Sequence, residues 1–106
     1  MKKLFISQPM AGKTDEEILS VRKLAIKQAK ERLGEDVVEI DSFFQGQPAF
    51  DKPLKYLAAS IELLADADVA YFAKDYHEAR GCKIERDCAV AYGIEIVDEW
   101  PEPIEE

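Results

Sequence analysis

The sequence predicts one α/β domain, a three-layer sandwich in which a four-stranded parallel sheet lies between helices on both of its faces. Two observations lead to this prediction. Four short apolar runs alternate along the chain with three segments in which apolar residues recur at helical spacing. The links between these elements are short. Strands that alternate with helices in this way are typical of parallel sheets with right-handed crossovers.

The first half of the chain is predicted to form a strand, a helix and a second strand. Residues 4–6 are an apolar run that ends at Ser7-Gln8-Pro9, as in a buried strand. Thr14 and Glu17 have the spacing of a capping box, with acidic residues in the first helical turn. The helix is predicted to end at Gly34, and residues 37–40 to form the second strand. The predicted buried stripe of the helix is Ile18, Val21, Ala25, Ala29 and Leu33.

The second half is predicted to add two helices and two strands. Residues 41–50 are irregular, and a helix begins at residues 51–53 because Pro53 is tolerated in a first turn. Residues 68–73 form the third strand, 81–92 the third helix and 94–97 the fourth strand. The single domain therefore spans residues 1–98, and the acidic tail 99–106 is expected to fray. The predicted buried stripe of the second helix is Leu54, Leu57, Ile61 and Leu64.

Composition limits the function classes. A formal net charge of −8 over 106 residues argues against binding to a nucleic acid polymer or an anionic membrane. No apolar stretch is long enough to span a bilayer, and the apolar run near the N-terminus is too short for a signal peptide, so we expect a cytoplasmic protein. So small a core favours a homo-oligomer.

Cysteine and histidine usage argues against a metal site, a disulfide framework or a metal cofactor. Cys82 and Cys88 are six residues apart, no Cys-x-x-Cys pair exists, and His77 is the only histidine. We expect two small buried thiols and no cofactor.

The working site is expected at the carboxyl edge of the sheet. Ligands in open parallel sheets bind outside the carboxyl ends of the strands, where the strand order reverses. Three predicted loops meet at that edge, residues 7–13, 41–50 and 74–81.

Glu85 is the strongest candidate for chemistry. It lies one turn into the third helix, inside an apolar arc, and a buried charge without a partner is costly. The helix N-terminus stabilises its ionised form, so a carboxylate that faces a pocket could serve as a nucleophile. The alternative is a partly exposed glutamate that is paired with Arg80, Lys83 or Arg86. The predicted arc consists of Ile84, Cys88, Ala89, Ala91 and Tyr92.

The first loop nearly matches a phosphate-binding P-loop. Gly12, Lys13 and Thr14 fit the pattern G-x-x-x-x-G-K-[ST], but Ser7 stands where the leading glycine is needed. No later strand shows the companion pattern of four apolar residues and a magnesium-binding aspartate. We therefore do not predict a nucleotide triphosphatase. Two alternatives stay open, backbone N–H groups that hold a phosphate or sugar and a simple strand-to-helix turn.

The other two loops carry further candidates. Asp41 is followed by Phe43 and Phe44, whose rings could stack on a planar base, close the core or join Tyr56 and Trp100 in a subunit contact. Tyr76 and His77 could reach a ligand from the third loop, although a lone loop histidine is more often solvated.

Three segments together resemble the nucleoside 2-deoxyribosyltransferase family, and more closely its small phage and bacterial members of unassigned function. They are residues 4–10, Leu-Phe-Ile-Ser-Gln-Pro-Met, residues 65–72, with Asp66 and Asp68 before an apolar strand, and residues 81–94, with Gly81, Glu85 and an alanine-rich stretch that ends in Gly93. The resemblance spans most of the chain. It implies a flavodoxin-like or Rossmann-like sheet and a nucleophilic Glu85 that attacks the anomeric carbon of a 2-deoxyribonucleoside. The base leaves, and a second base or water then takes the sugar from the glutamyl ester.

Two family acids have no match. Ala79 and Arg80 stand where one is expected, and Ala59 and Ser60 replace the other, so we consider Asp41, Asp75 and Glu78 as substitutes. Lys13 and Arg80 would suit a phosphate, which admits a nucleotide as substrate. With Glu85 as the catalytic residue, the expected substrate-binding residues are Ser7, Gln8, Pro9, Met10, Gly12, Asp41, Phe43, Phe44, Ser60, Tyr76, Arg80 and Gly81.

Three functions remain at this point. The first is N-glycosyl transfer or hydrolysis on a 2-deoxyribonucleoside or its monophosphate. The second is a non-catalytic nucleotide-binding module that uses the same pocket. The third is a small interaction protein in which Glu85 is only an ion-pair partner.

Overall fold

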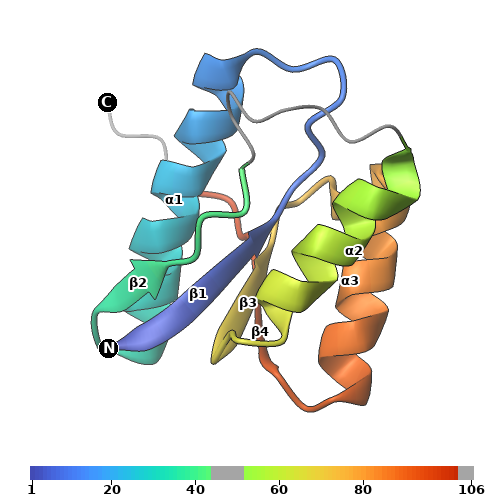
Figure 1. Cartoon of the computed structure of the whole chain (residues 1–106). Coiled ribbons are helices and arrows are strands. Elements are labelled where there is room, and N and C mark those ends of the chain that lie inside the picture. The colour runs from blue at the N-terminus through green and yellow to red at the C-terminus, as the bar shows by residue number, and fades with distance from the viewer. Residues whose placement is uncertain (44–51, 103–106) are drawn as a thin grey trace.

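A computed structural model describes residues 1–43 and 52–102, and within them it confirms the predicted α/β fold. Four parallel strands form one sheet in the order β2-β1-β3-β4 (Figure 1). The strands are β1 (Lys2–Ser7), β2 (Val37–Glu39), β3 (Val69–Phe72) and β4 (Glu95–Asp98). The helices are α1 (Asp15–Leu33), α2 (Pro53–Leu64) and α3 (Arg80–Ala91), with the short 3₁₀ helix η1 (Tyr76–Glu78) before α3.

The helices form two layers on opposite faces of the sheet. Figure 1 shows α1 on one face and α2 with α3 on the other. Right-handed crossovers require this arrangement, because the chain moves from β1 to β2 in one direction and from β2 to β3 and β4 in the opposite direction. The order matches the first four strands of a flavodoxin-like sheet, which places the reversal between β1 and β3.

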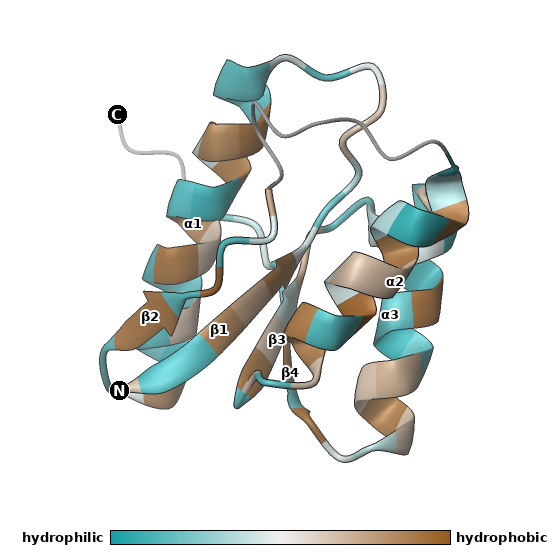
Figure 2. Ribbon diagram, in the orientation of Figure 1, coloured by the Kyte–Doolittle hydropathy of each residue, from teal (hydrophilic) through white to brown (hydrophobic). Residues whose placement is uncertain are grey.

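Each face of the sheet has its own hydrophobic core. Successive residues of β1 alternate between them, so Leu4 and Ile6 pack toward α1 while Phe5 packs toward α2 and α3. Tyr71 and Phe72 alternate in the same way on β3. Strands buried on both faces read as continuous apolar runs, and Figure 2 shows the hydrophobic colour on β2 and on β1 beyond its first residues.

The ends of α1 are as the sequence predicts. The Thr14 hydroxyl accepts a hydrogen bond of 3.1 Å from the Glu17 N–H, and the Glu17 carboxylate accepts one of 3.2 Å from the Thr14 N–H. Gly34 ends the helix in the left-handed conformation, with φ of 69°, and its N–H donates to the Lys30 carbonyl at 2.8 Å.

The helix faces differ in part from the predicted stripes. The buried side of α1 includes two polar residues, Arg22 and Gln28. Leu54, expected to be buried in α2, is 72% exposed and lies at the carboxyl edge of the sheet. The expected arc of α3 is also too wide, because a helix that rests on a sheet buries only a narrow strip of its surface. Cys82, Glu85 and Ala89 face inward, whereas Ile84, Ala91 and Tyr92 are exposed.

The chain after β4 is docked rather than frayed as far as residue 102. The Gln28 amide donates to the Trp100 carbonyl at 2.8 Å and accepts from the Trp100 N–H at 3.3 Å. The Arg32 guanidinium lies 5.5 Å from the centre of the Trp100 ring, and Lys27 forms an ion pair of 2.9 Å with Glu102. In the described part of the chain, none of the helices is long and apolar enough to cross a bilayer.

Candidate functional site

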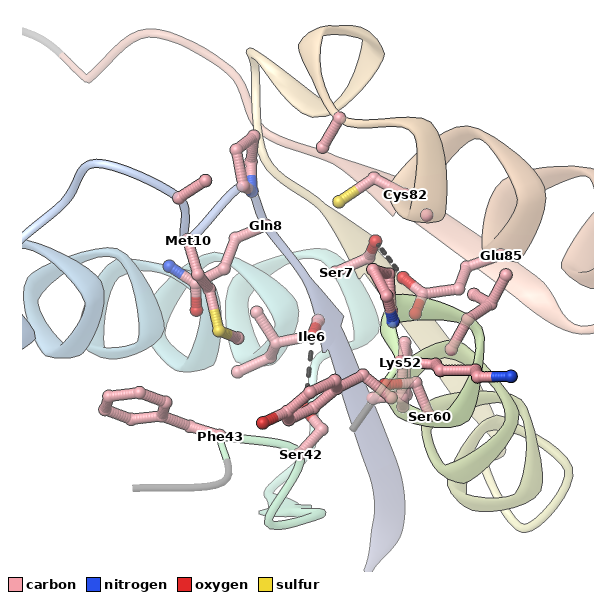
Figure 3. A pocket seen from close by; sticks show the side chains of 18 residues that line it. Ile6, Ser7, Gln8, Met10, Ser42, Phe43, Lys52, Ser60, Cys82 and Glu85 are labelled. Carbon is pink, nitrogen blue, oxygen red and sulfur yellow. Dashed lines mark hydrogen bonds between the residues drawn. The ribbon is translucent and has the colours of Figure 1, made fainter. Parts of the chain in front are cut away.

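A pocket of ≈ 750 Å³ opens at the carboxyl edge of the sheet, beside the reversal between β1 and β3 (Figure 3). The end of β1 and the loop after it form one wall, and the first turns of α2 and α3 form another. Ser42 and Phe43 reach the pocket from the chain after β2. We call it the Glu85 pocket. Its position is the one that the topology predicts for a ligand site.

Glu85 is buried in this pocket. Its side chain is 7% exposed, and Oε1 accepts a hydrogen bond of 2.6 Å from the Ser7 hydroxyl. The Ser60 hydroxyl is close enough to the carboxylate to lower its pKa as well. Figure 3 shows Ser7 and Glu85 facing each other from β1 and α3, with Ser60 nearby on α2. Three elements far apart in the sequence thus fix one carboxylate.

Two opposing effects set the protonation of Glu85. Burial raises the pKa of its carboxyl above the ordinary value, and the hydroxyls of Ser7 and Ser60 lower that pKa in part because they favour the ionised form. Within residues 1–43 and 52–102, no cation forms an ion pair with Glu85. The inward position is therefore confirmed and the ion-pair alternative is wrong.

Arg86, one of the expected ion-pair partners, has another role. Its guanidinium pairs with Asp98 at the end of β4, with one contact of 3.0 Å. It also lies 5.1 Å from the centre of the Phe72 ring and 4.9 Å from that of Tyr76. The next residue along α3 from Glu85 is thus directed away from the pocket.

Cys82 lies in the same wall, one helical turn before Glu85. The residue is 5% exposed, and burial raises the pKa of its thiol to about 11, with the hydrogen bond to Ser7 acting in the opposite direction. The thiol is therefore neutral at physiological pH and a poor nucleophile. The expected burial of Cys82 is confirmed, and Cys88 is half-buried against the core beneath α2 and α3.

The described lining of the pocket contains one carboxyl group, that of Glu85. Asp41, considered as a substitute acid, is exposed and does not line the pocket. Asp75 and Glu78 line a second hollow of ≈ 710 Å³, which adjoins the first and shares Gly81 with it. No second acid among the described residues therefore stands beside Glu85.

The second hollow also contains both cations expected to suit a phosphate. The Lys13 ammonium forms an ion pair of 3.0 Å with Asp75, and this contact and the nearby Glu78 raise the pKa of Lys13. A phosphate would have to compete with Asp75 for Lys13. Arg80 lines the same hollow and is exposed.

The first loop is a strand-to-helix turn. Gly12 has a φ of 77°, a conformation that favours glycine, and the Lys13 N–H donates to the Met10 carbonyl at 3.1 Å. Residues 15–17 are acidic, so the first turn of α1 repels a phosphate. The loop thus has the geometry of a simple turn, and the acidic first turn of α1 disfavours a phosphate at this helix.

Most of the expected site residues come together. Those that line the Glu85 pocket, besides Glu85 itself, are Ser7, Gln8, Pro9, Met10, Phe43, Ser60 and Gly81. Gly12, Asp41 and Tyr76 line neither hollow. Tyr76 instead packs edge-on against Phe72, with ring centres 5.7 Å apart. Phe44 lies outside the described residues.

Several residues that line the pocket were not predicted from the sequence. Among them are Ser42, Lys52 and Cys82. Arg22, which is 3% exposed and hydrogen-bonded to two residues of the pocket wall, was not predicted either. A signal was present, because Arg22 lies four residues after Ile18 and three before Ala25, inside the apolar stripe of α1. Tyr56, expected in a subunit contact, lines the pocket, and Trp100 packs against α1.

No group of three or more histidine, cysteine or acidic side chains within the described ranges is placed to hold a metal ion. What the arrangement offers is a buried carboxylate, two hydroxyl donors and apolar walls. A carboxylate so placed can bind a hydroxylated ligand, take up a proton or attack an electrophilic carbon.

Comparison with known proteins identifies the family of this chain. No curated protein matches the chain. The model of one family matches residues 2–98, which contain all four strands, all three helices and every described residue of the pocket lining. The chain therefore belongs to the family described as DUF4406, a domain of unknown function.

Proposed function

We propose that the protein catalyses N-glycosyl transfer or hydrolysis on a 2-deoxyribonucleoside or its monophosphate, with Glu85 as the nucleophile. One observation carries the proposal. A carboxylate without an ion-pair partner in the described chain is buried at the strand-order reversal, hydrogen-bonded by the Ser7 hydroxyl and close to that of Ser60. Burying such a group is costly, so its placement in a pocket favours a role in chemistry.

The proposed reaction has two steps. In the first, a Glu85 oxygen bonds to the anomeric carbon of the sugar as the bond from that carbon to the base nitrogen breaks. The electron pair of that bond leaves with the base, which takes a proton from water. In the second, a water molecule or the nitrogen of a second base bonds to the anomeric carbon. The ester bond then breaks, Glu85 regains its charge, and the attacking group releases a proton.

The pocket suits this substrate in size and lining. A volume of ≈ 750 Å³ lies within the usual range for small-ligand sites. Phe43 and Tyr56 add aromatic surface on which a planar base can stack. The Ser7 and Ser60 hydroxyls favour the ionised form of Glu85 against the effect of burial, and only the ionised form can attack.

A second candidate is a nucleotide-binding module that does not turn its ligand over. It is favoured by the single carboxyl group in the described lining, because enzymes that cleave glycosidic bonds ordinarily use two. In that case the Glu85 carboxylate would accept hydrogen bonds from sugar hydroxyls without forming a covalent bond.

An assay for free base separates the two candidates. The protein is incubated with each 2′-deoxynucleoside and each 5′-monophosphate, with and without a second base, and the products are resolved by chromatography. Base release by the wild type and not by Glu85→Ala supports glycosyl chemistry, and a new nucleoside identifies transfer. Ligand binding without base release, by a folded wild type, supports the binding module. Glu62→Ala, an exposed glutamate on α2, is the matched control and should retain activity.

A further inference from the structure

Arg22 is a buried cation at the centre of a polar network beside the Glu85 pocket. It lies on α1 and is 3% exposed. One of its terminal nitrogens donates to the Gln8 side-chain oxygen at 3.2 Å. The other donates to the Ile40 carbonyl and the Ser42 hydroxyl, both at 3.1 Å. Its Nε donates to the Glu39 carboxylate. A planar guanidinium can serve so many acceptors in fixed directions, and an ammonium cannot.

The network joins the ends of two strands. Gln8 follows β1, whereas Ile40 and Ser42 follow β2. Ser42 is 4% exposed, and its hydroxyl also donates to the Ile6 carbonyl at 3.3 Å, back on β1. Backbone pairing between the two strands covers only three residues of β2. The side-chain hydrogen bonds therefore hold the segments that follow the two strands together, past the point where the backbone pairing ends.

The network ends at the pocket wall. Gln8 and Ser42 both line the Glu85 pocket, and Phe43, the residue after Ser42, lines it as well. Figure 3 shows Phe43 and Ser42 on the side of β1 away from Glu85. The polar atoms of Gln8 are already in use, since its amide nitrogen donates to the Ile18 carbonyl at 3.2 Å. Gln8 and Ser42 therefore shape the wall, and Phe43 offers a flat apolar surface to a ligand.

We infer that Arg22 is a positioning residue that sets the base-binding wall of the pocket through Ser42 and Gln8. The identity of the bound group as a planar base rests on the proposed function. The two sides of the pocket then have separate tasks. Ser7, Ser60 and Glu85 act on the sugar, and the Arg22 network places Phe43 against the base. Loosening the network weakens ligand binding and leaves bond cleavage in the bound complex intact.

Three variants test this inference, in order of increasing expected loss of folding stability. Ser42→Ala removes one hydroxyl, Arg22→Lys keeps the charge but loses the planar fork, and Arg22→Met removes both. Gln28→Leu is the matched control. It removes another fully buried polar side chain from the same helix, whose bonds go to Tyr71, Trp100 and Glu102 and not to the pocket.

The measurements are the dissociation constant by calorimetry, KM and kcat for base release, and the melting temperature. The probes are the four 2′-deoxynucleosides and their 5′-monophosphates. We expect Ser42→Ala and Arg22→Lys to raise the dissociation constant about three- to tenfold, the effect of losing one ordinary hydrogen bond, because the network reaches the ligand only through the pocket wall, with kcat unchanged. Gln28→Leu lowers the melting temperature and leaves the dissociation constant as in the wild type.

Each outcome decides the inference. Unchanged binding in folded Ser42→Ala and Arg22→Lys overturns it, and so does a loss of binding in Gln28→Leu as large as theirs. A wild type that binds none of the probes overturns it too. The proposed function fails separately, if the wild type binds a probe and releases no base. In that case, weaker binding by the Arg22 and Ser42 variants still supports the positioning role.

Discussion

The hydroxyl of Ser7, at the end of β1, donates a hydrogen bond of 2.6 Å to Oε1 of Glu85, in the second turn of α3. The two residues are 78 positions apart in the sequence, and both are buried. This contact links the strand at the centre of the sheet to the candidate nucleophile. It orients the carboxylate and favours its ionised form.

Ser7→Ala should therefore raise the pKa of Glu85 further, because a hydrogen bond to the ionised form is lost while the burial remains. The acidic limb of the pH profile of kcat/KM should move to higher pH, and the rate at neutral pH should fall about three- to tenfold. Ser20→Ala, an exposed serine on α1, serves as the control. A profile for Ser7→Ala that coincides with the wild type would contradict the role assigned to Ser7.

Glu85 should also make stability depend on pH. Its pKa is higher in the folded than in the unfolded state, so the folded protein binds this proton more tightly. The resulting stabilisation is fully present below the ordinary carboxyl range and is lost as the pH rises through the raised pKa. Above the raised pKa the buried charge lowers the free energy of unfolding.

Glu85→Gln removes that charge and keeps an oxygen that can accept from Ser7 and Ser60. We expect it to stabilise the protein at pH 7 by about 1 kcal/mol, or roughly 4–8 °C in melting temperature, and to lose this advantage at low pH. Thermal unfolding followed by circular dichroism between pH 3 and pH 8 measures the difference. A variant that is less stable than the wild type at pH 7 would show that Glu85 has a structural role instead.

The hydrogen bonds of Gln28 to Tyr71 and Trp100 should contribute to stability and not to ligand binding in the Glu85 pocket. The Tyr71 hydroxyl, fully buried on β3, donates to the Gln28 amide oxygen at 2.7 Å. Gln28→Leu leaves that hydroxyl and the Trp100 backbone without their partner, and should lower the free energy of unfolding by about 2–3 kcal/mol. Urea unfolding measures this. Adding Tyr71→Phe should restore part of the loss, because one unpaired polar group is then removed, and a further loss would contradict the network.

The Cys82 thiol should react slowly with alkylating reagents at neutral pH. It is buried, and its pKa is raised to about 11, so little thiolate is present. In a Cys88→Ala background, mass spectrometry should show alkylation that accelerates as the pH rises. A nucleoside or nucleotide that occupies the Glu85 pocket should slow it further, since Cys82 lines the pocket. Rapid alkylation at pH 7, with or without such a ligand, would contradict the buried position.

Local patterns predicted the fold well, and the candidate site in part. Alternation of strand and helix was enough for the parallel sheet, and the capping box at Thr14 and the stop at Gly34 were visible as short motifs. Glu85 stood out because a charged residue on an apolar helix face conflicts with its surroundings. Arg22 is likewise a charged residue within the predicted apolar stripe of α1, and its burial was not predicted.

What the sequence did not predict depends on long-range contacts. The partners of Lys13 and Arg86 are Asp75 and Asp98, and no spacing rule identifies such pairs before the strands are assembled. The width of the buried strip on α3 depends on how the helix rests on the sheet, which is why Ile84 and Tyr92 were expected inside and are exposed. The docking of Trp100 required knowledge that Gln28 is buried opposite it.

The central claim is that Glu85 forms a covalent bond with the sugar, and trapping that bond tests it most directly. The wild type and Glu85→Gln are mixed with a 2′-deoxynucleoside or its 5′-monophosphate, quenched in acid during turnover, digested and mapped by mass spectrometry. The account predicts one deoxyribosyl group on the peptide that contains Glu85 in the wild type, and none in the variant. Base release by the wild type with no modified Glu85, or undiminished release by Glu85→Gln, would contradict it.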